Sequence, residues 1–224
     1  MKNCIYFADW HGAAPEGPRL KTGFCFDAEG RFVVPEGADG GGVLVPGGSE
    51  DGGVVLDDRE PPSGAGAAEA VRVLRAFRGP IVCDFERPPS PAAEALIRGL
   101  AGCDTAVPEQ YAHLPRAAVL IGPCRPGIGF RRWLDEKTAR FGRVVLDGGE
   151  IVGRVIVPDA GGTVRSTQGS ALCAGRAADY SCAGAMCRYR REGNAFVFFD
   201  TEETLRARAG AAGCPVILCR TGRE

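Results

Sequence analysis

The apolar residues of this chain fall into short runs bounded by glycine, proline and charged residues, and these runs alternate with segments of helical spacing. Runs of this length and setting predict strands. The expected strands cover 5–10, 53–57, 81–86, 105–107, 117–121, 143–147, 151–157, 195–199 and 215–219. The expected helices cover 67–77, 91–100, 130–141, the region around 170–178, and a segment that begins at Asp200 or Thr201.

Local signals at two helix starts agree with this pattern. Ser90 precedes Pro91, which suits an N-cap followed by the first helical position. Asp200 or Thr201 is the expected N-cap of the later helix, with Glu203 in its first turn. A hairpin with its turn at 29–30 is also expected, between apolar segments at 23–26 and 31–34.

Strands that alternate with helices of this length predict a parallel α/β architecture. The chain has 224 residues, which is enough for one small (β/α) barrel. We therefore predict a single TIM-type (β/α) barrel domain over 1–224. The glycine- and proline-rich region before residue 68 indicates that the barrel is shortened or irregular in its N-terminal part.

Composition limits the partners. Hydrophobic residues make up 45% of the chain, and the formal net charge is −1, so no nucleic-acid or membrane-surface partner is expected. The first apolar run is too short for a signal peptide and is followed by Asp9 and His11. No window reaches the roughly 18 apolar residues of a membrane span. We expect a cytoplasmic protein.

The chain has ten cysteines and two histidines, but no Cys-x-x-Cys. The spacings Cys182/Cys187 and Cys214/Cys219 are weak metal signals. Reduced structural thiols are favoured over a metal site or disulfides. No cofactor is expected.

The best candidate for chemistry is the pair Asp84 and Glu86, at the end of the strand 81–86. Side chains two apart on a strand share a face, about 6.6 Å apart along the chain. Two carboxylates that close raise one another's pKa, which favours a proton donor beside a charge. The structural alternative is that both cap a helix or pair with Arg59 and Arg87.

The segment Val82-Cys83-Asp84-Phe85-Glu86 resembles the end of the D-x-x-D-x-D-x-E signature of family-18 glycoside hydrolases, the chitinase-like family. A second segment, 195–208, resembles the F-x-D-x-x-S-L-x-x-K region of spore-cortex and peptidoglycan-acting members. In it Thr204 stands for the serine and Arg208 for the lysine. Shorter matches precede it at 170–174, Tyr180 and 188–189. The resemblance covers roughly the last two thirds of the chain.

The resemblance implies a TIM barrel that cleaves a glycan containing N-acetylglucosamine, with peptidoglycan or a chitin-like polymer as substrate. Glu86 would be the general acid. Asp84 would orient the substrate's N-acetyl group and stabilise the intermediate formed when that group attacks the anomeric carbon. Two signature aspartates fall on Gly79 and Val82, and the family's Met-x-Tyr-Asp has no counterpart at 121–124. Tyr111 is the candidate replacement for that tyrosine.

Other strand-end residues are candidate ligand contacts. Trp10 could stack on a sugar ring, with His11 beside it, or could be part of the core. The substrate-binding residues expected are Trp10, Tyr111, Glu109 and Asp57. No phosphate-binding glycine loop and no G-x-S-x-G is present.

Two alternatives to hydrolysis stay open. The first is a catalytically degenerate barrel that binds a glycan or a protein partner, in the cytoplasm or in association with spores. The second is a barrel enzyme that uses Mg²⁺ or Mn²⁺ bound by an acidic cluster. That cluster would comprise Asp57, Asp58, Glu60, Asp84 and Glu86.

Overall fold

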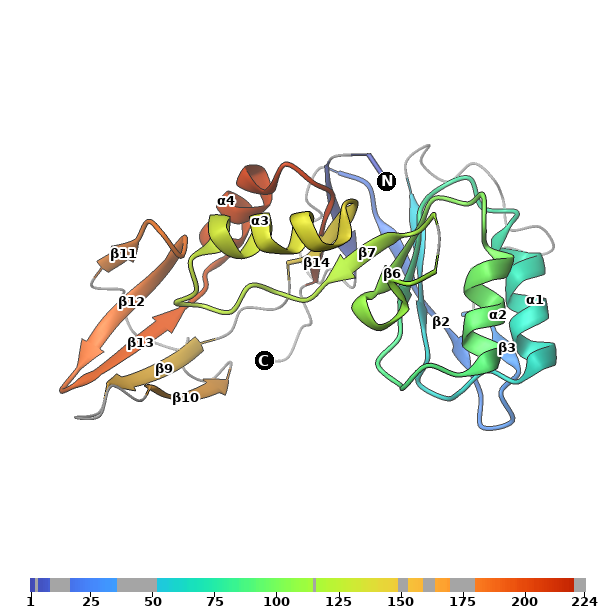
Figure 1. Ribbon diagram of the computed structural model, residues 1–224, viewed down its shortest axis with the longest axis horizontal. Coiled ribbons are helices and arrows are strands. Elements are labelled where there is room, and N and C mark those ends of the chain that lie inside the picture. Colours follow the sequence, from blue (N-terminus) through green and yellow to red (C-terminus); the bar gives the residue numbers. More distant parts are fainter. Residues whose placement is uncertain are drawn as a thin grey trace.

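A computed structural model describes residues 1–2, 4–8, 17–35, 52–114, 116–148, 153–158, 164–169 and 180–219, with the backbone alone at 164–169 and 219. The chain forms two sheets of different construction (Figure 1). One is a nine-stranded, largely parallel sheet flanked by helices. The other is a five-stranded antiparallel sheet at one end of the molecule.

The large sheet has the strand order β1-β14-β8-β7-β6-β5-β4-β2-β3. Every neighbouring pair is parallel except β2 and β3, which form an antiparallel hairpin. Its strands are β1 Ile5–Ala8, β2 Leu20–Phe26, β3 Phe32–Val33, β4 Gly53–Asp57, β5 Ile81–Asp84, β6 Thr105–Pro108, β7 Ala118–Ile121, β8 Val144–Asp147 and β14 Val216–Cys219. The parallel α/β prediction is confirmed at this level, and so is the hairpin.

The sheet is curled, because side chains from strands far apart in its order meet in one buried cluster. This inner cluster joins β1, β2, β5, β6, β7, β8 and β14. Its buried members are Tyr6, Ala8, Leu20, Val82, Ala106, Ala118, Val145 and Ile217. A flat sheet would keep β2 and β14 apart, so the cluster requires the curvature of a barrel wall.

In the part of the chain that the structure describes, four α-helices cover the outer side of the sheet. They are α1 Gly64–Leu74, α2 Pro91–Gly99, α3 Phe130–Phe141 and α4 Glu202–Ala212. The first two pack with β2, β4 and β5 in one buried cluster, and the last two pack with β1, β7, β8 and β14 in another. Ser90 caps α2 as predicted, since its hydroxyl accepts from the Ala93 N–H at 3.2 Å.

The two ends of the parallel order approach each other. Phe7 of β1 forms an isolated parallel bridge with Arg19, and its N–H donates to the Pro18 carbonyl at 3.0 Å. Arg19 directly precedes β2. The structure thus establishes a curled half-barrel, compatible with a shortened TIM-like barrel, with one bridge between the strands that would close it.

The small sheet lies in the sequence between β8 and α4 and has the order β10-β9-β13-β12-β11. Its strands are β9 Gly153–Pro158, β10 Val164–Gly169, β11 Tyr180–Cys182, β12 Cys187–Glu192 and β13 Ala195–Phe199. All of its neighbouring pairs are antiparallel.

The expectation that 151–157 and 195–199 extend the parallel alternation is therefore wrong. These segments form β9 and β13, which pair with each other in the small sheet. A two-residue turn that begins at Gly193 (φ 61°) joins β12 to β13, and so short a connection permits only antiparallel neighbours. The helix expected around 170–178 lies outside the described residues.

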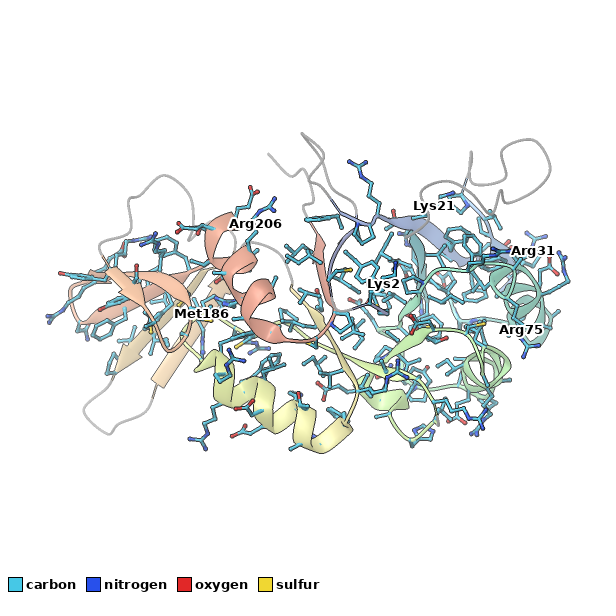
Figure 2. All side chains as sticks on the ribbon, turned by 90° about the horizontal axis from the view of Figure 1, so that it is seen from above. Lys2, Lys21, Arg31, Arg75, Met186 and Arg206 are labelled. Carbon is cyan, nitrogen blue, oxygen red and sulfur yellow. The ribbon has the colours of Figure 1, made fainter. Side chains whose placement is uncertain are left out.

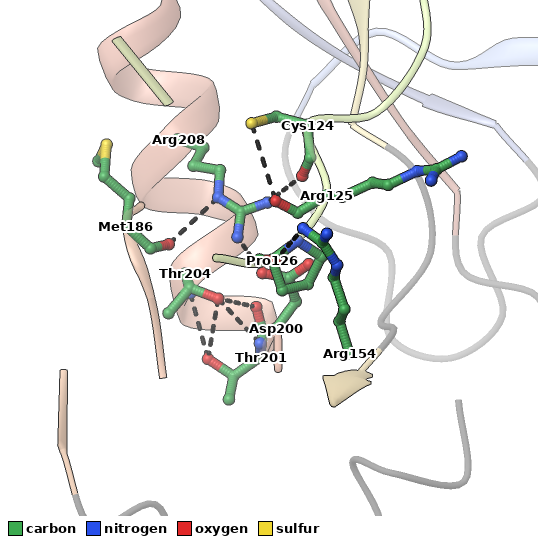
Figure 3. A network of polar contacts seen from close by, with 9 residues as sticks. All are labelled: Cys124, Arg125, Pro126, Arg154, Met186, Asp200, Thr201, Thr204 and Arg208. Atoms are coloured by element: carbon green, nitrogen blue, oxygen red, sulfur yellow. Dashed lines mark hydrogen bonds and ion pairs between the residues drawn. The ribbon is translucent and has the colours of Figure 1, made fainter. Parts of the chain in front are cut away.

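A buried ion pair fastens the small sheet to the large one (Figure 3). The Arg208 guanidinium of α4 contacts the Asp200 carboxylate, and both side chains are at most 6% exposed. Its Nη1 donates to the Cys124 carbonyl after β7 at 3.1 Å, and its Nε donates to the Met186 carbonyl between β11 and β12 at 3.2 Å. Met186, labelled in Figure 2, packs on the cluster of α3 and α4.

Candidate functional site

Three parallel strands of the large sheet end in an aspartate, so the three aspartates lie at the same, carboxyl-terminal end of the sheet. β4 ends at Asp57, β5 at Asp84 and β8 at Asp147. Asp57 and Asp84 are register partners on adjacent strands. The carboxyl ends of parallel strands are where barrel proteins carry their functional groups. An acidic group therefore lies at the edge where the sequence placed the site.

Asp84 and Glu86 face solvent, while the residues between and before them are buried. Cys83 is fully buried and Phe85 is 3% exposed in the helix layer, whereas Asp84 and Glu86 are both exposed. In the described part of the chain, neither carboxylate forms a hydrogen bond or ion pair through its side chain. β5 ends at Asp84, and the alternation of buried and exposed residues continues past it to Glu86, which separates both acids from the core.

The arginines that were expected to compete for these acids bind elsewhere. Arg59 pairs with Asp57 at 3.4 Å, and Arg87 pairs with Glu60 at 3.2 Å. Arg87 also donates to the Asp58 and Arg59 carbonyls, at 3.0 Å and 2.6 Å for the shortest contact with each. The purely structural explanation of Asp84 and Glu86, in which arginines neutralise them, does not describe this arrangement.

The backbone that carries Glu86 is held from both sides. The buried carboxylate of Asp58 accepts from the Glu86 N–H at 2.8 Å and from the Arg87 N–H at 3.0 Å. On the other side, Gln110 Nε2 donates to the Phe85 carbonyl at 3.1 Å and to the Arg87 carbonyl at 2.7 Å. Charge-assisted and paired bonds of this kind fix a loop in one position. The Glu86 side chain therefore projects from a rigid support.

Electrostatics distinguish Asp84 from an ordinary surface carboxylate. Its pKa is raised from 3.8 to about 6, by burial first and then by the nearby charges of Asp147, Asp57, Glu86 and Asp58, in that order. The side chain is still open to solvent, so water screens part of the burial. The surrounding carboxylates support the same direction by repulsion. The pKa of Asp84 therefore lies closer to neutral pH than that of an ordinary surface aspartate.

Glu109 and Tyr111 occupy less open positions. Glu109 forms an ion pair with Lys137 of α3. Tyr111 ends the short 3₁₀ helix Glu109–Tyr111, is fully buried, and meets Phe85 edge-on with ring centroids 5.9 Å apart. Burial raises the pKa of Tyr111 to about 12. Tyr111 offers no solvent-facing surface to a ligand, so the structure gives no support to its expected contact with an N-acetyl group.

Trp10 and His11 lie outside the described residues, so their expected role stays a prediction. The end of β7 is described. Residues 122–124 there supply no tyrosine or aspartate, and Cys124 is buried beside Arg208.

The donors of the expected metal cluster do not converge. Within the residues that the structure describes, no group of three His, Cys, Asp or Glu side chains is placed to hold a metal ion. Asp58 is bonded to backbone N–H groups, and Asp57 and Glu60 pair with arginines. This geometry does not favour the Mg²⁺ or Mn²⁺ alternative.

Asp147 and Gln110 belong to the site but were not predicted. Asp147 had a signal in the sequence, because Val145-Leu146-Asp147 repeats the pattern of Val55-Leu56-Asp57 and Val82-Cys83-Asp84. Gln110 had none, since its two acceptor carbonyls are brought to it only by the pairing of β5 with β6. The same holds for the supporting role of Asp58.

A hollow of about 380 Å³ lies at the opposite end of the strands. Its lining includes Ala118, Val144 and Pro215, at or next to the first residues of β7, β8 and β14. Asp84 and Asp147 end their strands, so this hollow is separate from the acidic group. Its charged lining groups, among them Arg131, Asp135 and Arg143, have mixed signs, as on an ordinary polar surface, and do not form a cluster of catalytic acids.

Solved structures were compared with this architecture. The Bacillus cereus spore cortex-lytic enzyme SleL aligns with a TM-score of 0.50 and 11% identity, over 97% of this chain and 70% of that one. This likeness shows that the chain shares the fold of that enzyme. The resemblance expected from the sequence is thus confirmed for the fold. The chitinase-like agglutinin RobpsCRA from Robinia pseudoacacia aligns with a TM-score of 0.49 and 13% identity, over 91% and 87% of the two chains.

No protein-family model and no curated protein matches the chain. Among the described residues, no helix has the length and apolar character needed to cross a membrane.

Proposed function

We propose that this chain is a family-18-like glycoside hydrolase acting on a glycan that contains N-acetylglucosamine. The observation that carries the proposal is the pair Asp84 and Glu86, unpaired and solvent-facing at the end of β5 on a backbone held by Asp58 and Gln110. A rigid support of this kind is what a proton donor needs, because small displacements reduce the rate steeply.

In the proposed reaction Glu86 donates a proton to the glycosidic oxygen. The N-acetyl group of the substrate attacks the anomeric carbon, and the bond to the leaving sugar breaks. Asp84 stabilises the positive charge that develops on the N-acetyl group. Water then opens the intermediate while Glu86 takes back a proton. Asp84 must be ionised for this role, and a pKa of about 6 leaves it largely ionised at neutral pH.

The proposed substrate class is a peptidoglycan or chitin-like polymer. The B. cereus enzyme is a spore cortex-lytic enzyme, which supports the peptidoglycan option by likeness of fold. Trp10, Glu109 and Asp57 remain proposed substrate contacts. Carbohydrate as the partner and the cytoplasm as the location likewise stay predictions.

We further propose that the parallel strands close into one shortened barrel across 1–224. The bridge between Phe7 and Arg19 and the shared inner cluster support this closure.

A second function, glycan binding without cleavage, is favoured by two features. The end of β7 lacks the tyrosine and aspartate expected there, and among the described residues Tyr180, on the small sheet, is the one exposed large hydrophobic side chain. A barrel that keeps Asp84 and Glu86 but lacks this tyrosine and aspartate would bind a glycan without cleaving it.

The deciding experiment measures cleavage of N-acetylglucosamine oligomers and of muropeptides by the wild type and by Glu86→Gln. We expect the variant to lose roughly 100- to 10,000-fold in rate, the range for removal of a general acid. Glu136→Gln on α3 is the matched control, because Glu136 is an exposed acid that pairs with Arg132 on the same helix.

Equal rates for the wild type and Glu86→Gln would eliminate the proposed mechanism. Binding of the oligomers without turnover, by a folded wild type, would instead establish the binding function.

A further inference from the structure

Two cysteines close the hairpin formed by β11 and β12. Cys182 ends β11, Cys187 begins β12, and the two are register partners in an antiparallel pair. Both are free thiols. The intervening residues 183–186 form the turn.

The register brings the two thiols together. Residues directly opposite in an antiparallel pair have Cα atoms about 4.5 or 5.5 Å apart, and a disulfide needs about 4.4–6.8 Å. Their side chains project to the same face. The next pair on that face shows this contact, because the rings of Tyr180 and Tyr189 stack with centroids 5.1 Å apart.

We propose that Cys182 and Cys187 are a redox-responsive pair that forms a cross-strand disulfide when the protein meets a small-molecule disulfide such as oxidised glutathione. This site lies outside the acidic group and does not depend on the function proposed for it.

The two thiols have different parts in the reaction. Cys182 is half-buried and can be reached from solvent, whereas Cys187 is 2% exposed and burial raises its pKa to about 11. The Cys182 thiolate attacks glutathione disulfide, which forms a mixed disulfide and releases one glutathione thiolate. The Cys187 sulfur then loses its proton and attacks the Cys182 sulfur. This releases the second glutathione and leaves the protein disulfide.

The turn between the cysteines holds the small sheet against the barrel. The Gly184 carbonyl accepts from the Phe130 N–H at the start of α3, at 2.9 Å. The Met186 carbonyl accepts from Arg208 of α4 at 3.2 Å, and Met186 has a positive φ of 49°. A disulfide at the base of this turn restricts the unfolded chain and keeps both carbonyls in place. Oxidation should therefore raise the Tm.

The sequence allows a sharp test, because its two methionines are Met1 and Met186. Cyanogen bromide cleaves after methionine, so it cuts the chain between Cys182 and Cys187. The folded protein is treated with oxidised glutathione, its remaining thiols are blocked by alkylation, and the chain is then cleaved without reductant. We expect fragments 2–186 and 187–224 to stay joined until a reductant is added.

Three variants complete the experiment. In Cys182→Ser and in Cys187→Ala the fragments should separate, and oxidation should leave the Tm unchanged. In Cys103→Ser, which removes a half-buried thiol elsewhere, the fragments should stay joined. Separated fragments from the oxidised wild type would overturn the proposal. So would fragments that stay joined in Cys182→Ser, because the link would then lie between other cysteines.

Discussion

Asp84 and Asp200 carry similarly perturbed carboxyl groups in two very different surroundings. Burial raises the pKa of each from 3.8 to about 6. Around Asp84 the nearby charges are other carboxylates, and its side chain is open to solvent. Around Asp200 the neighbour is the Arg208 guanidinium, and both partners are buried.

The difference shows that a raised pKa alone does not identify a functional group. Asp200 is matched by a cation that also binds the Cys124 and Met186 carbonyls, so its role is to fasten the small sheet to the large sheet. Asp84 has no matching cation among the described residues. Its ionised form is therefore disfavoured, and a proton or a cationic ligand group would relieve this. Accessibility and the sign of the neighbouring charges separate the two cases.

The largest expected effect on stability comes from breaking the buried pair. Arg208→Ala should lower the free energy of unfolding by about 3–5 kcal/mol, because it leaves Asp200 as a buried, unmatched carboxylate. Chemical denaturation at neutral pH measures this. Arg206→Ala, on the same helix, removes a pair with the half-buried Glu202 and a contact with the Phe7 ring, and should cost less, about 1 kcal/mol. Similar losses for the two variants would show that the buried Arg208–Asp200 pair stabilises the fold no more than the Arg206–Glu202 pair does.

Removing the charge of Asp84 is expected to raise the free energy of unfolding, opposite to the effect at Arg208. The folded-state pKa of about 6 exceeds the unfolded value of 3.8, so this group favours the folded state fully below pH 3.8 and loses that contribution as the pH rises through 6. Asp84→Asn should therefore stabilise the protein at pH 7. The full shift corresponds to roughly 3 kcal/mol, and solvent screening reduces the expected gain to about 1 kcal/mol.

Unfolding measured from pH 4 to pH 7 tests this sign. The gain of Asp84→Asn over the wild type should be near zero at pH 4 and complete near pH 7. A variant less stable than the wild type at pH 7 would show that Asp84 has a structural role like that of Asp200.

The smallest effect concerns Asp147, the charge that acts most strongly on Asp84. If the chain is a hydrolase, its activity should fall in acid with an apparent pKa near 6 as Asp84 takes up a proton. Asp147→Asn removes one repulsion, so the acid limb of the pH–activity profile should move to lower pH by less than about one unit. The pH profile of kcat/KM measures it. A limb that does not move would assign the titration to another group.

Much of the larger sheet was predictable, because short apolar runs and helical spacing fix the local elements. The strand 53–57 and the helix 130–141 have the predicted bounds, and Ser90 caps α2 as predicted. The Asp84/Glu86 pair was predicted from a two-residue spacing on a strand over 81–86, but β5 ends at Asp84 and Glu86 lies just beyond it. The small sheet was missed in part because β12 reads Cys-Arg-Tyr-Arg-Arg-Glu and lacks the apolar alternation of an ordinary strand.

The sequence by itself determined the alternation of strands and helices, the helix caps and the exposed pair of acids, since these depend on residues close together in the chain. The tertiary structure alone decided which acids keep a partner. Asp58 accepts from a backbone 28 residues away, and Arg208 reaches the Cys124 carbonyl across 84 residues. Burial and opposing charge depend on which segments pack together, so contacts over such separations leave no local pattern in the sequence.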